Sequence, residues 1–332
     1  MSILYGTFPW AFETPGGGEI QLLKYEEYAK QAGLDIQRFD PWTNQIKVHD
    51  TAKPKGFHYF SCVGGSIPIC NYVKSQGIPL IISSSLWLTE QDLHLYPIAE
   101  ITHQLNLADK IVTNGDIESD QISDLLNIDR SRFVTIRNAC DPDFLKQVPG
   151  EIFEQQFAIQ KPFVLCIGNI EPRKNQLNLI KAVQQTELDL ILIGHVRDEI
   201  YAQKCWDATG AETRYIGSIA HEDPILKSAL SAASVFCLPS TLETPGLAAL
   251  EAGAVGTPLI VTRHGSTQEY FHDFADYCEP DDVASLRDLI KNRFNNTQSM
   301  RCEALQTHIR NNLTWPNVIK ELNALYQKEF NL

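Results

Sequence analysis

The sequence has no apolar run that approaches the roughly 20 residues of a membrane-spanning helix. Its eight cysteines include no Cys-x-x-Cys pair, and several lie inside apolar runs, so neither a zinc site nor a disulfide framework is predicted. Basic residues are few, with 28 Lys and Arg against 41 Asp and Glu and a net charge of -13. These absences argue against nucleic-acid binding. They favour a cytoplasmic protein whose membrane contact would be peripheral, at the inner membrane face.

The 332 residues are enough for two domains, and strand-like and helical segments alternate along both halves. The strand-like segments are residues 3–5, 36–39, 58–62, 80–83, 110–113 and 133–136, then 163–167, 188–193, a segment near 215, and 235–238. This alternation predicts a doubly wound parallel α/β sheet in each half. We expect an N-terminal Rossmann-like domain over residues 1–150, a C-terminal one over 151–312 and a terminal helix over 313–332.

One stretch, residues 234–269, is the most informative. An apolar strand ends at Pro239, a loop carries Glu243, and a helix of small residues begins near Gly246. Glu251 is the only charged side chain between Thr244 and Thr262, and a buried carboxylate needs a partner from elsewhere in the protein or from a ligand. We expect both carboxylates to face a cleft at the carboxyl edge of the sheet, where ligands bind in such folds. The N–H groups at the start of the helix add a site for a phosphate or a hydroxyl.

Two basic residues, Arg173 and Lys174, follow the strand at 163–167. At that place they would project toward the same cleft, where Arg can bind a diphosphate through two nitrogens and Lys can add a point charge. The alternative is a solvated basic turn before a helix. Three glycines, Gly16-Gly17-Gly18, follow the first strand and precede a helix expected from Glu19. Their N–H groups could approach an anion closely, and the alternative for them is a flexible connector.

The pattern Glu243-x7-Glu251, followed by Gly-Thr-Pro-Leu-Ile-Val-Thr and Gly265-x3-Glu269, resembles the donor-site signature of retaining GT-B glycosyltransferases of family 4, the glycosyl transferases group 1. The segment 168–180 is similar to that family's phosphate-binding segment. The resemblance implies two Rossmann-like domains facing a cleft, with the acceptor side in the first and the nucleotide-sugar site in the second. It also implies a terminal helix that crosses back to the first domain.

The implied reaction moves a hexose-type sugar, with retention, from a UDP- or GDP-sugar to a glycan, lipid-linked or protein acceptor in surface glycan synthesis. No metal or other cofactor is required by this resemblance, and contact with other glycosyltransferases in a complex is an implied partnership. Glu243 would accept hydroxyls of the hexose and Glu251 the ribose diol, while Glu269 would brace the loop at Gly265. The groups expected to contact the diphosphate or the sugar pocket are Arg173, Lys174, Gly17, Gly18, Pro245, Gly246 and Leu247.

The chain departs from the family in the first domain, where many members have a His after the strand at 80–83 and this chain has Ser83-Ser84-Ser85. A degenerate, non-catalytic subunit that binds glycan or a partner protein is therefore an alternative. A dinucleotide-dependent dehydrogenase fits poorly because the three glycines lack the G-x-G-x-x-G spacing. Asp141-Pro-Asp143 in a Pro-broken linker is a weak candidate for a metal motif. For the acceptor, the aromatic candidates are Trp10, Phe12, Trp42 and Trp87, and packing in the core is an equal alternative for each.

Overall fold

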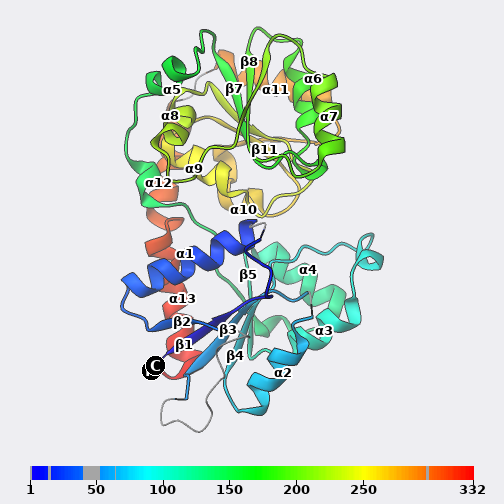
Figure 1. The fold of residues 1–332 in the computed structure, drawn as a ribbon, viewed down its shortest axis with the longest axis vertical. Helices are drawn as coiled ribbons and strands as arrows, with labels where there is room; N and C mark the ends of the chain where they lie inside the picture. The colour runs from blue at the N-terminus through cyan, green and yellow to red at the C-terminus, as the bar shows by residue number, and fades with distance from the viewer. Residues whose placement is uncertain (1, 14–15, 40–52, 64, 297–298) are drawn as a thin grey trace. The chain divides into compact units, whose positions relative to one another are not determined.

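The computed structural model describes residues 2–13, 16–39, 53–63, 65–296 and 299–332, and it divides into two compact units. Unit 1 consists of residues 1–138 and 315–332, and unit 2 of residues 139–314. Unit 2 thus begins before the residue 151 expected from the sequence, because the linker that follows residue 138 packs with unit 2. In each unit, helices cover both faces of a central sheet (Figure 1).

Unit 1 holds a six-stranded parallel sheet with the order β2-β1-β3-β4-β5-β6. The strands are β1 (Ile3–Gly6), β2 (Ile36–Arg38), β3 (Gly56–Phe60), β4 (Leu80–Ser83), β5 (Lys110–Thr113) and β6 (Phe133–Thr135). The helices are α1 (Gly17–Gln31), α2 (Ile67–Ser75), α3 (Ile98–Leu107), α4 (Asp116–Leu126) and α13 (Trp315–Phe330), with 3-10 turns η1 (Leu93–Leu95) and η2 (Arg130–Arg132). The central strands are buried along their length, which explains why they appear in the sequence as continuous apolar runs.

Helix α13 is fixed to the sheet of unit 1 by a buried chain of hydrogen bonds. The hydroxyl of Tyr326 lies 2.8 Å from that of Tyr5 and 2.5 Å from Nδ1 of His58, whose Nε2 lies 2.8 Å from Oγ of Ser83. Burial lowers the pKa of His58 to about 3, so its ring is neutral at physiological pH. Helix α13 is thus linked by hydrogen bonds, through His58, to the carboxyl end of β4.

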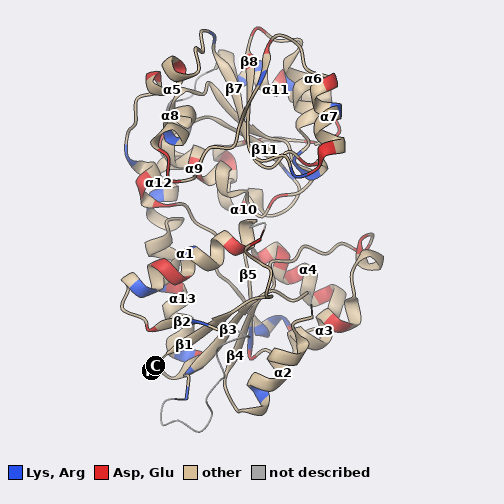
Figure 2. Ribbon diagram, viewed as in Figure 1, with Lys and Arg blue, Asp and Glu red and all other residues tan. Residues whose placement is uncertain are grey.

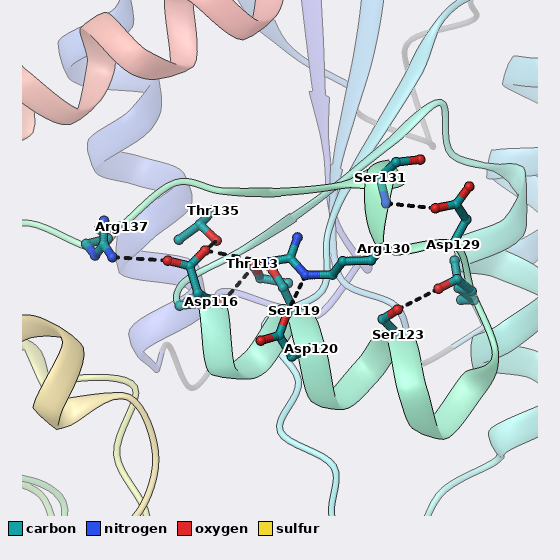
Figure 3. Close-up of polar contacts among 12 residues, drawn as sticks. Thr113, Asp116, Ser119, Asp120, Ser123, Asp129, Arg130, Ser131, Thr135 and Arg137 are labelled. Atoms are coloured by element: carbon teal, nitrogen blue, oxygen red, sulfur yellow. Dashed lines mark hydrogen bonds and ion pairs between the residues drawn. The ribbon is translucent and has the colours of Figure 1, made fainter.

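Helix α4 is held against β6 by polar contacts at its amino-terminal half (Figure 3). Asp116 accepts a hydrogen bond of 2.6 Å from Oγ1 of Thr135 and lies 3.4 Å from Nη2 of Arg137. Arg130, in η2, pairs with Asp120 one turn further along the helix. Acidic positions such as these are spread along α4 and α1, in keeping with the negative net charge (Figure 2).

Unit 2 holds a second six-stranded parallel sheet, with the order β12-β11-β10-β7-β8-β9. Its strands are β7 (Phe163–Ile167), β8 (Asp189–Ile193), β9 (Thr213–Gly217), β10 (Val235–Leu238), β11 (Leu259–Thr262) and β12 (Asp276–Cys278). Its helices are α5 (Glu151–Gln156), α6 (Gln176–Val183), α7 (Glu199–Asp207), α8 (Pro224–Ala232), α9 (Leu247–Val255), α10 (Thr267–Phe271), α11 (Val283–Asn295) and α12 (Ser299–Asn312), with 3-10 turns η3 (Pro142–Leu145), η4 (Pro172–Lys174) and η5 (His272–Phe274). The predicted fold class, two doubly wound α/β sheets, is confirmed.

Helix α1 begins at Gly17, earlier than the Glu19 expected from the sequence. The side chain of Glu19 accepts a hydrogen bond of 2.7 Å from the N–H of Gly16, and this cap allows the two glycines to form the first turn. All eight cysteines have free thiols, and seven of them are buried. None of the described helices combines the length and the apolar character needed to cross a bilayer.

Candidate functional site

The loops after β7 and β10 meet at one edge of the unit 2 sheet. The two strands are parallel neighbours, so their carboxyl ends lie side by side. The N–H of Thr241 donates to the carbonyl of Arg173 at 2.8 Å, and Nη1 of Arg173 donates to the carbonyl of Leu242 at 3.1 Å. The structure therefore brings the basic segment and the loop of Glu243 together.

Asn175 closes the basic segment and holds it in place. Its φ of 58° is left-handed, a conformation that Asn tolerates better than most residues, and it separates η4 from α6. Its buried amide donates to the carbonyls of Pro239 and Pro280 at 3.0 and 2.7 Å. One side chain thus joins the ends of three loops, which sets where the two cations before it can lie.

Glu243 forms a buried ion pair with the basic segment. Its Oε1 lies 2.5 Å from Nζ of Lys174 and 3.5 Å from Nη1 of Arg173. The side chains of Glu243 and Lys174 are only 5% and 12% exposed, whereas that of Arg173 is 47% exposed. Burial alone would raise the pKa of Glu243, but the charges of Lys174 and then Arg173 outweigh it and hold the pKa below its usual range. Glu243 is thus ionised, and Arg173 is the cation open to solvent.

Arg173 also contacts Glu171 at 3.2 Å, and Glu171 lies 3.6 Å from Arg197, in the loop between β8 and α7. With Lys174 and Glu243, these side chains make a cluster of three cations and two carboxylates. The local charge is therefore positive in a chain that is strongly acidic overall. Such a cluster can attract an anionic ligand although the whole protein repels one.

Gly265 allows two loops of unit 2 to touch. The N–H of Glu243 donates to the carbonyl of His264 at 3.2 Å, and the N–H of Ser266 donates to the carbonyl of Glu243 at 3.0 Å. Between these bonds Gly265 has a φ of 99°, and a Cβ there would lie 2.0 Å from the carbonyl oxygen of Glu243. Any side chain at this position would displace the loop that carries the buried carboxylate.

Helix α9 begins beside the same carboxylate. Gly246 precedes it with a φ of 88°, and a Cβ on Gly246 would lie 3.2 Å from Oε2 of Glu243. The N–H groups of Leu247 and Ala248 precede the first hydrogen bonds of the helix, which Ala249 and Leu250 donate to the carbonyl of Gly246, and the start of a helix favours negative charge. Pro245, which is buried, lies directly before this turn, so the predicted residues 245–247 follow Glu243 closely along the chain.

Glu251 lies on α9, 6% exposed, and its Oε1 lies 2.7 Å from Nε2 of His221. The need for a partner was evident from the sequence, because Glu251 is the lone charge on a helix of small apolar residues. His221 was not predicted, since it belongs to the polar loop between β9 and α8 and no spacing relates it to α9.

In unit 1, Gly17 and Gly18 form the first turn of α1, and a Cβ on Gly18 would lie 3.6 Å from Oγ of Ser85. Ser85 is exposed and has a φ of 44°, which is uncommon for Ser. The loop before it is held by Glu118, a buried residue of α4 that was not predicted from the sequence. Glu118 accepts hydrogen bonds of 2.8 Å from Oγ of Ser84 and from the N–H of Asn114.

The remaining candidates have simpler surroundings. Asp141 caps η3 by accepting from the N–H of Asp143, and Asp143 pairs with Lys227, so these two carboxylates have structural partners. Glu269 lies half-buried on α10. Among the aromatic candidates, Trp10 is 60% and Phe12 40% exposed, Trp87 is half-buried, and Trp42 lies outside the described residues.

Residues 149–301, which include every predicted site residue of unit 2, match the family model of glycosyl transferases group 1. This part of the chain is a glycosyl transferases group 1 domain. The family resemblance carried by Glu243-x7-Glu251 is thereby confirmed.

Relatives of this chain include the O-antigen chain mannosyltransferase B of Escherichia coli, which is 30% identical over 203 residues, 58% of this chain and 53% of that protein. The GDP-mannose-dependent monoacylated alpha-(1-6)-phosphatidylinositol monomannoside mannosyltransferase of Corynebacterium glutamicum is 28% identical over 125 residues, 34% of this chain and 32% of that protein. The chain thus spans about half or less of the length of these curated relatives.

Two solved structures share the fold over nearly the whole chain. Anabaena HepE in complex with UDP has a TM-score of 0.83 at 16% identity and covers 99% of this chain and 100% of its own. Sucrose-phosphate synthase from Thermosynechococcus elongatus has a TM-score of 0.81 at 16% identity, with 100% of both chains covered. At this identity the likeness establishes the GT-B fold and nothing further.

Proposed function

We propose that this protein is a retaining glycosyltransferase that moves a hexose-type sugar from a nucleoside-diphosphate sugar to a glycan, lipid-linked or protein acceptor in surface glycan synthesis. The observation that carries the proposal is the cluster of Arg173, Lys174 and Glu243 at the carboxyl edge of the unit 2 sheet. It lies within the segment that matches the family model. A lipid-linked acceptor would be reached through a peripheral contact at the inner membrane face.

Arg173 and Lys174 differ in solvent exposure, and this difference supports a separate role for each in binding the donor. Arg173, half-exposed, can turn from Glu171 to the diphosphate and bind two of its oxygens. Lys174 is buried against Glu243, so its charge acts from a fixed position on the negative charge that develops as the sugar leaves. Further hydrogen bonds to the nucleotide-sugar are assigned to backbone N–H groups. These are the N–H groups of Gly246 and Leu247 in unit 2 and of Gly17 and Gly18 in unit 1.

The carboxylates would orient the donor. In this proposal Glu243 accepts hydroxyls of the hexose next to Pro245, and Glu251 accepts hydroxyls of the ribose. Holding the donor in one orientation lowers the entropic part of the barrier. None of these proposed contacts requires a metal ion. Glu269, on α10, would brace the loop at Gly265.

The names of the relatives favour mannose as the sugar and guanosine diphosphate as its carrier, since two of them are mannosyltransferases and one is GDP-mannose-dependent. The structural neighbour with UDP shares the fold alone, so its ligand is the second choice. GDP-mannose is therefore the first donor to test, and UDP-glucose the second.

The first experiment is thermal unfolding with GDP, UDP, ADP, CMP or NAD. A ligand at 100 times its Kd stabilises the folded protein by about 2.7 kcal/mol and raises Tm by several degrees. Arg173→Ala should bind the stabilising nucleotide about tenfold more weakly, because it removes charge-assisted hydrogen bonds. Arg130→Ala is the matched control, since Arg130 is similarly exposed and ion-paired but lies in unit 1. Stabilisation by NAD alone would contradict the proposal.

Turnover separates the enzyme from a non-catalytic subunit. Release of GDP from GDP-mannose in the presence of a mannoside acceptor, with an α-linked product from the α-linked donor by NMR, is the expected result. Nucleotide binding without release of any sugar, from GDP-mannose or UDP-glucose, would favour the non-catalytic alternative. The absence of binding to every nucleotide would overturn the proposed function.

A further inference from the structure

The carboxylate of Glu251 is held on one side only. It is 6% exposed, and among the residues that the structure describes its one hydrogen bond runs from Nε2 of His221 to Oε1, at 2.7 Å. A carboxylate oxygen accepts and cannot donate, so Nε2 carries the proton of this bond. The second oxygen, Oε2, is thus left to accept from a ligand.

The ring of His221 packs against a buried aromatic ring. Its ring centroid lies 5.4 Å from that of Phe144, a residue of η3 that is 3% exposed. The neighbouring Asp143 pairs with Lys227 of α8, and this contact joins η3 to the helix that follows the loop of His221. The side chain of His221 is 36% exposed, whereas that of Glu251 is 8% exposed. A partner with a packed ring restricts the rotamers of the carboxylate more than water would.

We infer that His221 is a positioning residue: it fixes Glu251 so that Oε2 accepts a hydroxyl of the donor ribose, and it thereby sets a preference for ribonucleotides over 2′-deoxynucleotides. This inference rests on the proposed function, since it concerns the same donor site. A site that accepts a hydrogen bond from a hydroxyl rejects the analogue without it, because the acceptor is then buried without a partner. For a charged acceptor the rejection is about tenfold or more.

The test is calorimetric affinity for GDP and 2′-deoxy-GDP, and for UDP and 2′-deoxy-UDP. The wild-type protein should prefer the ribonucleotide of one pair by about tenfold or more. His221→Phe keeps a ring against Phe144 and removes the donor, so the preference should fall to about threefold or less. His221→Gln offers an N–H to Oε1 and should recover most of the preference. His94→Ala, an exposed His of unit 1, is the matched control and should leave the preference unchanged.

Kinetics give a second readout. With a turning-over donor, His221→Phe should raise the donor KM while kcat at saturating donor stays within about twofold, because the ribose lies away from the reacting bond. Equal loss of affinity for both members of a nucleotide pair in His221→Phe would show a merely structural role and overturn the inference. Binding by the wild type without a ribose preference would overturn the inference alone. Binding of no nucleotide would overturn the proposed function and the inference with it.

Discussion

Replacing Glu243 by Gln tests whether the buried ion pair of unit 2 is an electrostatic unit. Gln keeps the size of the side chain but removes the charge that lies 2.5 Å from Nζ of Lys174. Lys174, 12% exposed, is then left without its counter-ion and with the like charge of Arg173 nearby. Breaking a buried pair at one partner costs about 3–5 kcal/mol, and we expect Glu243→Gln to lose that much of the free energy of unfolding.

The assay is urea unfolding of a double-mutant cycle made of Glu243→Gln, Lys174→Met and the double variant. Removing both charges leaves no uncompensated ion, so the double variant should be more stable than the sum of the two losses predicts, by at least about 1 kcal/mol. Because the pKa of Glu243 is lowered in the folded state, the carboxylate contributes stability above its unfolded pKa of about 4.3 and loses it as the pH falls through the folded pKa. The stability gap between wild type and Glu243→Gln should therefore narrow under acid conditions.

A loss below about 0.5 kcal/mol in Glu243→Gln at pH 7 would refute this reasoning, because it would mean that the pair is solvated like a surface salt bridge. Strict additivity in the cycle would refute it as well. Lys174→Met alone tests whether Arg173 can replace Lys174 as the partner of Glu243. If Arg173 does so, this variant should lose less of the free energy of unfolding than Glu243→Gln.

Three further predictions concern other parts of the chain. Gly265→Ala should destabilise the protein by about 2–4 kcal/mol in urea unfolding, because its φ of 99° strains Ala and its Cβ would overlap the carbonyl of Glu243; a fully stable variant would contradict this. Trp10→Ala should change stability by less than about 0.5 kcal/mol, since Trp10 is 60% exposed, but should raise the acceptor KM and leave the donor KM unchanged; the reverse pattern would exclude it from the acceptor site. His58→Gln should lose stability relative to wild type at pH 7, and the gap should narrow by about 2 kcal/mol at pH 5, because the pKa of His58 is about 3 when folded and about 6.5 when unfolded. A gap that does not change with pH would contradict a buried neutral ring.

The fold was predictable because its central strands are buried on both faces and therefore appear as apolar runs at regular intervals. The meeting of Arg173, Lys174 and Glu243 followed from a single rule, that parallel neighbours present their carboxyl ends at one edge. The start of α1 was misplaced because a glycine pair usually ends helical order, and here Glu19 caps the turn that contains it.

His221 and Glu118 escaped prediction for a different reason. Each contacts loops or helices that no periodicity relates to its own position: His221 reaches α9 from a polar loop, and Glu118 reaches the loops after β4 and β5 from α4. On its helix Glu118 is one of four acidic residues, and its burial at 1% exposure distinguishes it only in the folded chain. A side chain's partners across elements depend on packing, which the spacing of residue types along a chain does not encode.

The two glutamates of the signature are equivalent in the sequence but not in the structure. Glu243 has its charge compensated by Lys174 and Arg173, and its second oxygen lies near the first turn of α9. Glu251 has His221 as its hydrogen-bond partner, and its second oxygen has no hydrogen bond to any residue that the structure describes. Removing the charge of Glu243 should therefore mainly lower the free energy of unfolding and leave Lys174 and Arg173 without their counter-ion. Removing the charge of Glu251 should mainly weaken recognition of the ligand. Comparing Glu243→Gln with Glu251→Gln in both assays would show this division directly: the first should lower the free energy of unfolding more, and the second should reduce the ribose preference more.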